Sequence, residues 1–232
     1  SYLGSTIGWR GAFLCLVPVA IVAFIWQYFS LPNMGGNQRP SPRKSVFRLL
    51  HQPAVSVGLM ACGLFFMGQF ALFTYVRPFL ETVTHVSPSG LSLILLTIGI
   101  AGFIGTLIVA LVLNAAFYLT LMAIPLLMAL IAGVLMLTGD SLWIVALLLG
   151  FWGMLATAAP TGWWTWIART LPEDAEAGGG LMVAVIQLSI ALGSTAGGVV
   201  FDTFGWQSTF ALSSILLLSA GVLTFTTSRH RE

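Results

Sequence analysis

The sequence predicts an all-α protein, a polytopic bundle of membrane-spanning helices. Of its 232 residues, 58% are hydrophobic and 7% are charged, whereas soluble domains have roughly 45–50% and 25%. Runs of about 20 apolar residues, the length of one bilayer crossing, recur along the chain. These runs lack the two-residue alternation that the strands of a membrane β-barrel show. The pattern therefore favours helices.

Seven apolar runs are long enough to cross a bilayer as helices. Turn-forming residues such as Pro, Gly, Ser and Asn separate most of them, and the weakest break is Asn114 with Ala115 and Ala116. The predicted spans are 11–30, 54–79, 90–113, 117–138, 142–168, 177–201 and 207–227. The chain begins with Ser1 and no signal-peptide pattern precedes the first span. We therefore expect this sequence to be a piece of a longer protein.

The basic residues predict the orientation of these spans. Most of them fall on one side of the membrane when the spans are counted alternately, and by the positive-inside rule that side is cytoplasmic. These residues are Arg39, Arg43, Lys44, Arg48, Arg169, Arg229 and Arg231. The C-terminus is then expected to be cytoplasmic, and Ser1 to lie outside.

Small residues cluster in two spans and indicate close helix packing. Lipid supplies no hydrophobic drive between helices, so glycine at a contact lets the backbones approach each other. We favour packing over a gating hinge for these residues, which are Gly99, Gly102, Gly105, Gly193, Gly197 and Gly198. Pro160 and Gly162 are expected to bend or loosen the fifth span.

Four polar residues in otherwise apolar spans are candidate substrate-binding residues. Gln69 and Gln187 lie near the middle of their spans, where an amide is costly unless it finds a partner. Each could bond a neighbouring helix or contact a substrate. Tyr75 lies about 120° around the helix from Gln69, so one cavity sees both only if it is wide. Arg77, near the outer end, is favoured to snorkel to the interface over forming an ion pair or clamping a substrate.

Three tryptophans close the fifth span, in the stretch APTGWWTWIARTLP. They can form an interfacial aromatic belt. Trp163 and Trp166 share a helix face while Trp164 points elsewhere. If lipid takes Trp164, the Trp163/Trp166 face could line an aqueous cavity and stack on a planar ligand.

Several other classes of function are excluded by the residues. A net charge of +2 without a basic patch does not suggest nucleic-acid binding. No catalytic set, cofactor motif or metal-ligand spacing is present, and Cys15 and Cys62 are expected to be small core residues. A retinal protein would need a lysine within a span, whereas the only lysine, Lys44, lies in the first loop. No Asp or Glu falls at mid-span, so any proton-coupling group is expected outside this chain.

Four stretches carry a family resemblance. They are IGWRGAFL, FRLLHQPAVSVGLM with GQFALFTYVRPFL, LTIGIAGFIGT, and TGWWTWIARTLPEDAEAGGGLMVAVIQLSIALGSTAGGVVFDTFGW. The chain resembles the second half of a bacterial major facilitator superfamily transporter of the drug:proton antiporter-1 group, and most of all its purine ribonucleoside efflux branch. One departure is the Asn114–Ala116 break, where the family normally has basic residues.

The resemblance implies a fragment of a twelve-helix fold whose substrate binds between two six-helix halves. Residues 1–30 would be the last helix of the N-terminal half, 31–52 the central cytoplasmic loop and 53–232 the C-terminal half. It implies a multi-pass protein of the bacterial inner membrane that exchanges protons for outward-moving nucleosides. Our hypothesis is that Gln69 and Tyr75 line the central cavity, joined by Gln187, Trp163 and Trp166. The partners implied are a small polar substrate, protons, the lipid bilayer and the missing N-terminal half.

Two alternatives remain open from the sequence alone. The cargo could be a drug or a sugar, because half a pocket fits several small polar molecules. The chain could also be a truncated remnant without transport activity, since alternating access needs two halves.

Overall fold

The computed structural model describes residues 8–30 and 46–229, and all of the regular structure in these ranges is helical. The elements are α2 (Gly8–Leu14), α3 (Leu16–Ser30), the short 3-10 helix η1 (Val46–His51), α4 (Pro53–Phe73), α5 (Val76–Thr82), α6 (Pro88–Ala115), α7 (Phe117–Thr138), α8 (Leu142–Thr170), α9 (Ala175–Phe204) and α10 (Trp206–Arg229). The prediction of an all-α membrane bundle is confirmed.

Six segments of the described chain are long and apolar enough to cross a membrane. They correspond to the second through seventh predicted spans, with α4 and α5 together forming the first of them, Pro53–Thr82. The first predicted span, 11–30, differs, because it is divided at Cys15 into α2 and α3. Proline has no N–H, so Pro18 leaves the carbonyl of Leu14 without its helical donor at this break.

A similar break divides the second predicted span. Thr74 and Tyr75 separate α4 from α5, and Tyr75 has φ −105° and ψ 8°. Pro78 lies four residues after Thr74 and cannot donate to its carbonyl. Pro125 and Pro160, by contrast, lie inside the continuous helices α7 and α8.

The helix ends follow the local sequence. Ser87 caps α6, with its Oγ accepting a hydrogen bond from the Gly90 N–H at 3.2 Å, and Pro88 occupies the first turn. Gly205 ends α9 with φ 86°, in the left-handed region that glycine tolerates. These turns fix where each helix reverses.

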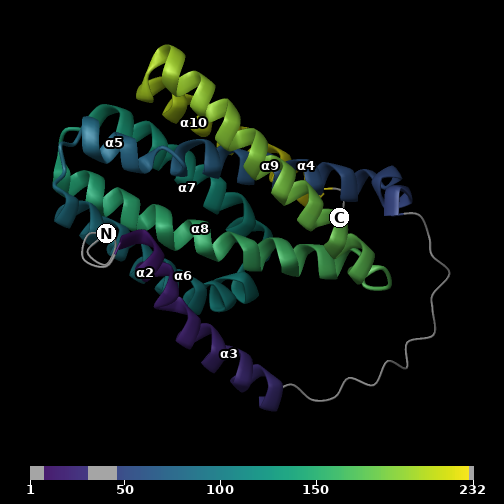
Figure 1. Ribbon diagram of the computed structural model, residues 1–232. Helices are drawn as coiled ribbons and strands as arrows, with labels where there is room; N and C mark the ends of the chain where they lie inside the picture. Colours follow the sequence, from purple (N-terminus) through teal and green to yellow (C-terminus); the bar gives the residue numbers. More distant parts are fainter. Residues whose placement is uncertain (1–7, 31–45, 230–232) are drawn as a thin grey trace.

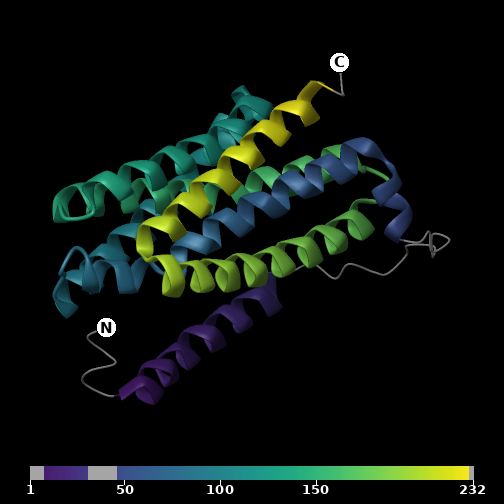
Figure 2. The same cartoon turned by 90° about the horizontal axis from the view of Figure 1, so that it is seen from above.

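The bundle is organised around α4, which contacts α9 and α10, while α7 lies between α8 and α10 and α6 packs against α8 (Figures 1 and 2). In an apolar stretch of 18 residues from each span, 67% of the residues are buried in α4–α5 but only 17% in α9. Every residue of α3 is exposed. The core therefore lies between α4, α7, α8 and α10, and α9 presents an open face.

Glycines allow the closest helix contacts. At the α6–α8 seam, a Cβ on Gly102, Gly105 or Gly153 would collide with atoms of the opposite helix. At the α4–α9 seam, a Cβ on Gly193 or Gly197 would meet the backbone of Met67 or Ala71. Gly99 differs from the expectation, because it is exposed and has open space where a Cβ would lie.

At the junction of α6 and α7, the nearby positive charge is an arginine of α8. The Arg169 guanidinium, near the end of α8, lies 4.3 Å from the centroid of the Phe117 ring at the start of α7. Such cation–π contacts are favourable at this distance. The break of Asn114, Ala115 and Ala116 is thus accompanied by a basic residue that is distant in sequence.

Candidate functional site

Gln69 lies deep in α4 and is 8% exposed. Its Oε1 is buried and has no hydrogen-bond partner among residues 8–30 and 46–229. A buried acceptor without a partner costs about 1–3 kcal/mol. The interpretation that Gln69 forms a hydrogen bond to a neighbouring helix therefore has no support in the described structure. The amide oxygen stays available to accept a hydrogen bond from another group.

Tyr75 joins the break in α4–α5 to α9. Its hydroxyl donates to the Ser194 carbonyl oxygen at 2.9 Å, and its ring stacks on Phe201 with the centroids 5.2 Å apart. Thr74 Oγ1 lies 3.0 Å from Ser194 Oγ, within hydrogen-bond distance. We call these four residues the Tyr75 cluster. Gly198 makes room for the Tyr75 hydroxyl, because a Cβ there would collide with it.

Gln187 is exposed on α9, seven residues before Ser194. Seven residues are about two helical turns, so Gln187 and Ser194 share one face of α9. The open face of α9 thus carries an amide about two turns from the Tyr75 cluster. Gln69 is not part of this row of polar residues, and no hydrogen bond joins it to Gln187 in the described parts of the chain.

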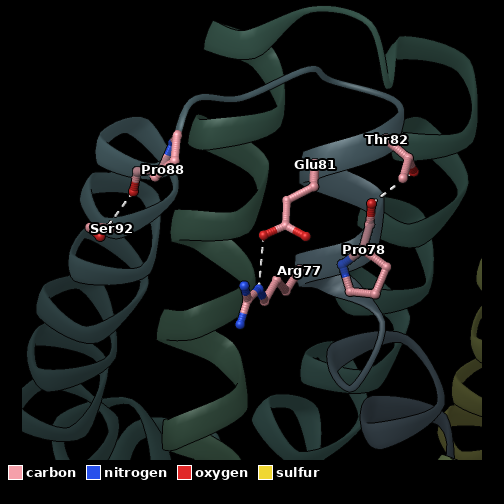
Figure 3. Close-up of polar contacts among 6 residues, drawn as sticks. All are labelled: Arg77, Pro78, Glu81, Thr82, Pro88 and Ser92. Carbon is pink, nitrogen blue, oxygen red and sulfur yellow. Dashed lines mark hydrogen bonds and ion pairs between the residues drawn. The ribbon is translucent and has the colours of Figure 1, made fainter. Parts of the chain in front are cut away.

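Arg77 forms an ion pair at the outer end of α5. Its Nε lies 2.9 Å from Glu81 Oε1, one helical turn away, and the two side chains are 71% and 44% exposed (Figure 3). The same view shows the Thr82 hydroxyl donating to the Pro78 carbonyl at 2.8 Å. Arg77 therefore forms an ion pair, and its exposure is also what a side chain that snorkels to the interface would show. Its exposure places it at the rim rather than in the core.

The tryptophans of α8 do not fit the alternative in which Trp163 and Trp166 line a cavity. Trp163 and Trp166 do share a face, with ring centroids 5.9 Å apart, but they are only 2% and 1% exposed. Trp166 fills the space beside Gly58 of α4, so neither indole lines an open cavity. Trp164 remains 45% exposed, and its ring lies against Gly179 of α9. The accessible indole is therefore Trp164, which that alternative had placed against lipid.

A signal for Trp164 was present in the sequence. The run Gly178–Gly180 opens α9 and offers a flat surface without side chains to a large ring. Pro160 lies one turn earlier and is half-buried within the unbroken α8. The indole at position 164 is thus held where α8 and α9 meet, close to the turn between them.

Two hollows between helices lie elsewhere. One of about 230 Å³ lies between α6 and α8, and a neighbouring one of about 120 Å³ extends to α7. Both are lined almost entirely by apolar atoms, and Met154 contributes to both. None of the predicted polar site residues lines either of them.

Known proteins resemble this chain closely. The chain is 60% identical over its full length to "Transcription regulatory protein OpdE" of Pseudomonas aeruginosa, covering 58% of that protein. It is 41% identical over 94% of its length to "Purine ribonucleoside efflux pump NepI" of Salmonella enteritidis, covering 55% of that protein, and the match to NepI of Salmonella typhimurium is of the same extent. The chain thus spans little more than half the length of these relatives.

The family model of the Major Facilitator Superfamily matches residues 1–182. The match includes α2 through α8 and the first turns of α9. The resemblance inferred from the sequence motifs is therefore confirmed at the level of the family. The chain belongs to the Major Facilitator Superfamily of membrane transporters, which is not a family of enzymes.

Proposed function

We propose that the complete protein containing this chain exports purine ribonucleosides across the bacterial inner membrane by alternating access, in exchange for protons. The similarity to the purine ribonucleoside efflux pump NepI along 94% of the chain is the observation that carries this proposal. In this assignment residues 1–30 end the N-terminal half, 31–52 form the central loop and 53–232 form the C-terminal half, with a cytoplasmic C-terminus. Most of 31–52 lies outside the described residues.

The exposed and unpaired polar groups suit a nucleoside. Gln187 and the Gln69 amide can bond base edges or ribose hydroxyls, since an amide both donates and accepts. Trp164 can stack on a purine ring. Trp163 and Trp166, which are buried on another side of α8, would hold that helix in place, and Tyr75 would hold α9 against the α4–α5 break. The described acidic residues lie at helix ends, so the proton site is proposed in the other half of the protein.

Export of radiolabelled inosine from cells tests the proposal. Gln69→Ala and Gln187→Ala should each lower the export efficiency about five- to tenfold, because each removes a hydrogen bond to cargo. Gln207→Ala is the matched control, since Gln207 is an exposed glutamine at the start of α10. Collapse of the proton gradient should abolish the difference between expressing and empty cells. Unchanged export by both variants, at equal amounts of protein in the membrane, would refute the proposed site.

A second candidate function is an effect on gene expression, because the relative at 60% identity is called a transcription regulatory protein. Six candidate membrane spans and a net charge of +2 argue against direct contact with DNA. Such an effect could arise indirectly if the protein changes the concentration of a solute. Export-deficient Gln69→Ala should then alter transcripts in the same way as gene deletion, whereas wild-type transcript levels in that variant would separate the two activities.

A further inference from the structure

A second buried polar atom without a partner lies in α8. Trp152 is completely buried, and its indole Nε1 has no hydrogen-bond acceptor in the described ranges 8–30 and 46–229. Gln69 Oε1 and Trp152 Nε1 are the two buried side-chain atoms of this kind in the described part of the molecule. One is an acceptor without a donor and the other a donor without an acceptor, so each could satisfy the other.

The register of α4 shows that Gln69 faces α8. Gly58 of α4 contacts the Trp166 ring of α8, which fixes one point of this interface. Gln69 comes eleven residues later, a rotation that returns to within about 20° of Gly58. Gly63 and Gly68 point instead to Ser189 of α9 and Leu217 of α10, and lie about 120° and 100° away from Gln69.

The register of α8 shows that Trp152 faces α4. Trp152 precedes Trp166 by fourteen residues. At about 100° per residue, the two side chains therefore leave α8 in directions that differ by only about 40° around the helix axis, and Trp166 contacts Gly58 of α4. The neighbouring Gly153 packs on Ile98 of α6, and lies about 100° away. The two residues without partners therefore lie on facing sides of α4 and α8.

The two residues also lie at similar depth. Gln69 follows Gly58 along α4, whereas Trp152 precedes Trp166 along α8. Because the two helices run in opposite directions, both residues lie on the same side of the Gly58–Trp166 contact, and their distances from it can be compared. Gln69 lies about 16 Å along α4 from this contact, and Trp152 about 21 Å along α8. The difference along the helix axes is less than one turn. Because α4 contacts α8 much less than it contacts α9 and α10, pairing of the two residues would require the two helices to approach each other at this level.

We propose that Trp152 is the positioning residue of Gln69, and that its indole N–H donates a hydrogen bond to the Gln69 amide oxygen when cargo is bound. This inference rests on the proposed function. With its oxygen held by Trp152, the amide turns its NH₂ group away from α8, toward an acceptor on the base or ribose of a nucleoside. In the described conformation the bond is absent and both groups are unpaired.

A double-mutant cycle in the complete protein tests this positioning. Trp152→Phe removes the N–H and keeps an aromatic ring, and Gln69→Met removes the amide at similar length. Trp152→Phe should raise the KM for inosine about fivefold with little change in kcat, the effect of one hydrogen bond. In the Gln69→Met background it should add nothing, because Trp152 acts only through Gln69. An equal loss in both backgrounds, or no loss in either, overturns the proposal.

The hydrogen bond itself can be observed by NMR on the ¹⁵N-tryptophan-labelled protein in nanodiscs. The indole N–H resonance of Trp152 is identified by its loss in Trp152→Phe. Inosine should shift it in the wild type and not in Gln69→Met, and an inosine-induced shift that persists in Gln69→Met, or no shift in the wild type, overturns the proposal. Trp143→Phe is the control, since Trp143 on the same helix is 83% exposed.

Two failures remain distinguishable. If wild-type protein neither exports nor binds inosine, the proposed cargo is wrong, and the pairing proposed to form with that cargo falls with it. If wild-type protein exports inosine but the cycle is additive, the function stands and the pairing is wrong. If Trp152→Phe does not reach the membrane, Trp152→Tyr, which also lacks the indole N–H, replaces it both in the cycle and in the assignment of the resonance.

Discussion

The α6–α8 seam and the α4–α9 seam both bring helix backbones together at glycines, yet they differ in what surrounds those glycines. At the α6–α8 seam, the Thr157 hydroxyl donates to the Gly102 carbonyl at 2.7 Å, and the adjoining hollows are almost wholly apolar. The α4–α9 seam leads to the break between α4 and α5, where the Tyr75 cluster bonds side chains across the helices. Glycine packing thus joins two unbroken helices at the α6–α8 seam. At the α4–α9 seam it joins helices whose contact ends at a helix break with polar side chains.

The largest expected effect comes from filling either seam. Gly105→Ala and Gly193→Ala each place a Cβ against the backbone of the opposite helix, and such overpacking costs about 1–3 kcal/mol. The free energy of unfolding in bicelles measures this. The matched control is Gly99→Ala, which meets open space and should stabilise α6 by about 0.5–1 kcal/mol. Equal stability of all three variants would mean that the glycines do not set the helix separation.

A smaller effect is expected from the Tyr75 cluster. Tyr75→Phe keeps the ring on Phe201 and removes the bond to Ser194, so it should cost about 0.5–1.5 kcal/mol. It should also increase hydrogen exchange at the start of α5, where the helix is already broken. Tyr118→Phe on α7 is the control, because no hydrogen bond of that hydroxyl is found in the described chain. A Tyr75→Phe variant as stable as the wild type would show that packing alone closes the α4–α9 seam.

The smallest effect is expected at Arg77. Its ion pair with Glu81 is exposed, and such i,i+4 pairs contribute about 0.3–0.5 kcal/mol. Arg77→Gln should therefore change stability by no more than this, and high salt should remove the difference. A large loss of nucleoside export at normal stability would instead identify Arg77 as a substrate clamp. The substrate would then be contacted at the exposed end of α5, beyond the Tyr75 cluster.

The fold was predictable in outline because apolar length and turn residues are strong signals. The helix breaks were less so, since the effect of a proline depends on its neighbours. Pro18 and Pro78 follow breaks, whereas Pro125 and Pro160 lie in unbroken helices. Buried packing around α7 and α8 can hold a helix together where one hydrogen bond is missing. That packing is a property of the assembled bundle and is not visible in a single span.

The site was predictable only in part. Gln69 and Gln187 stand out because amides are rare in apolar spans. The burial of Trp163 and Trp166 and the exposure of Trp164 could not be deduced from spacing, which shows that Trp163 and Trp166 share a face but not which face is buried. Trp152 carries no sequence signal at all, because a tryptophan in an apolar run is ordinary until its N–H is found without an acceptor.

The contact of Arg169 with Phe117 has a consequence for how this protein is oriented during insertion. The hairpin of α6 and α7 has no cation in its own turn, and its neighbouring arginine is synthesised about fifty residues later. On the orientation predicted from the basic residues, we therefore expect the cytoplasmic positive charge beside this hairpin to be supplied late, by a residue of α8. If this orientation holds, the topology of one helical hairpin depends on the arrival of a later helix beside it.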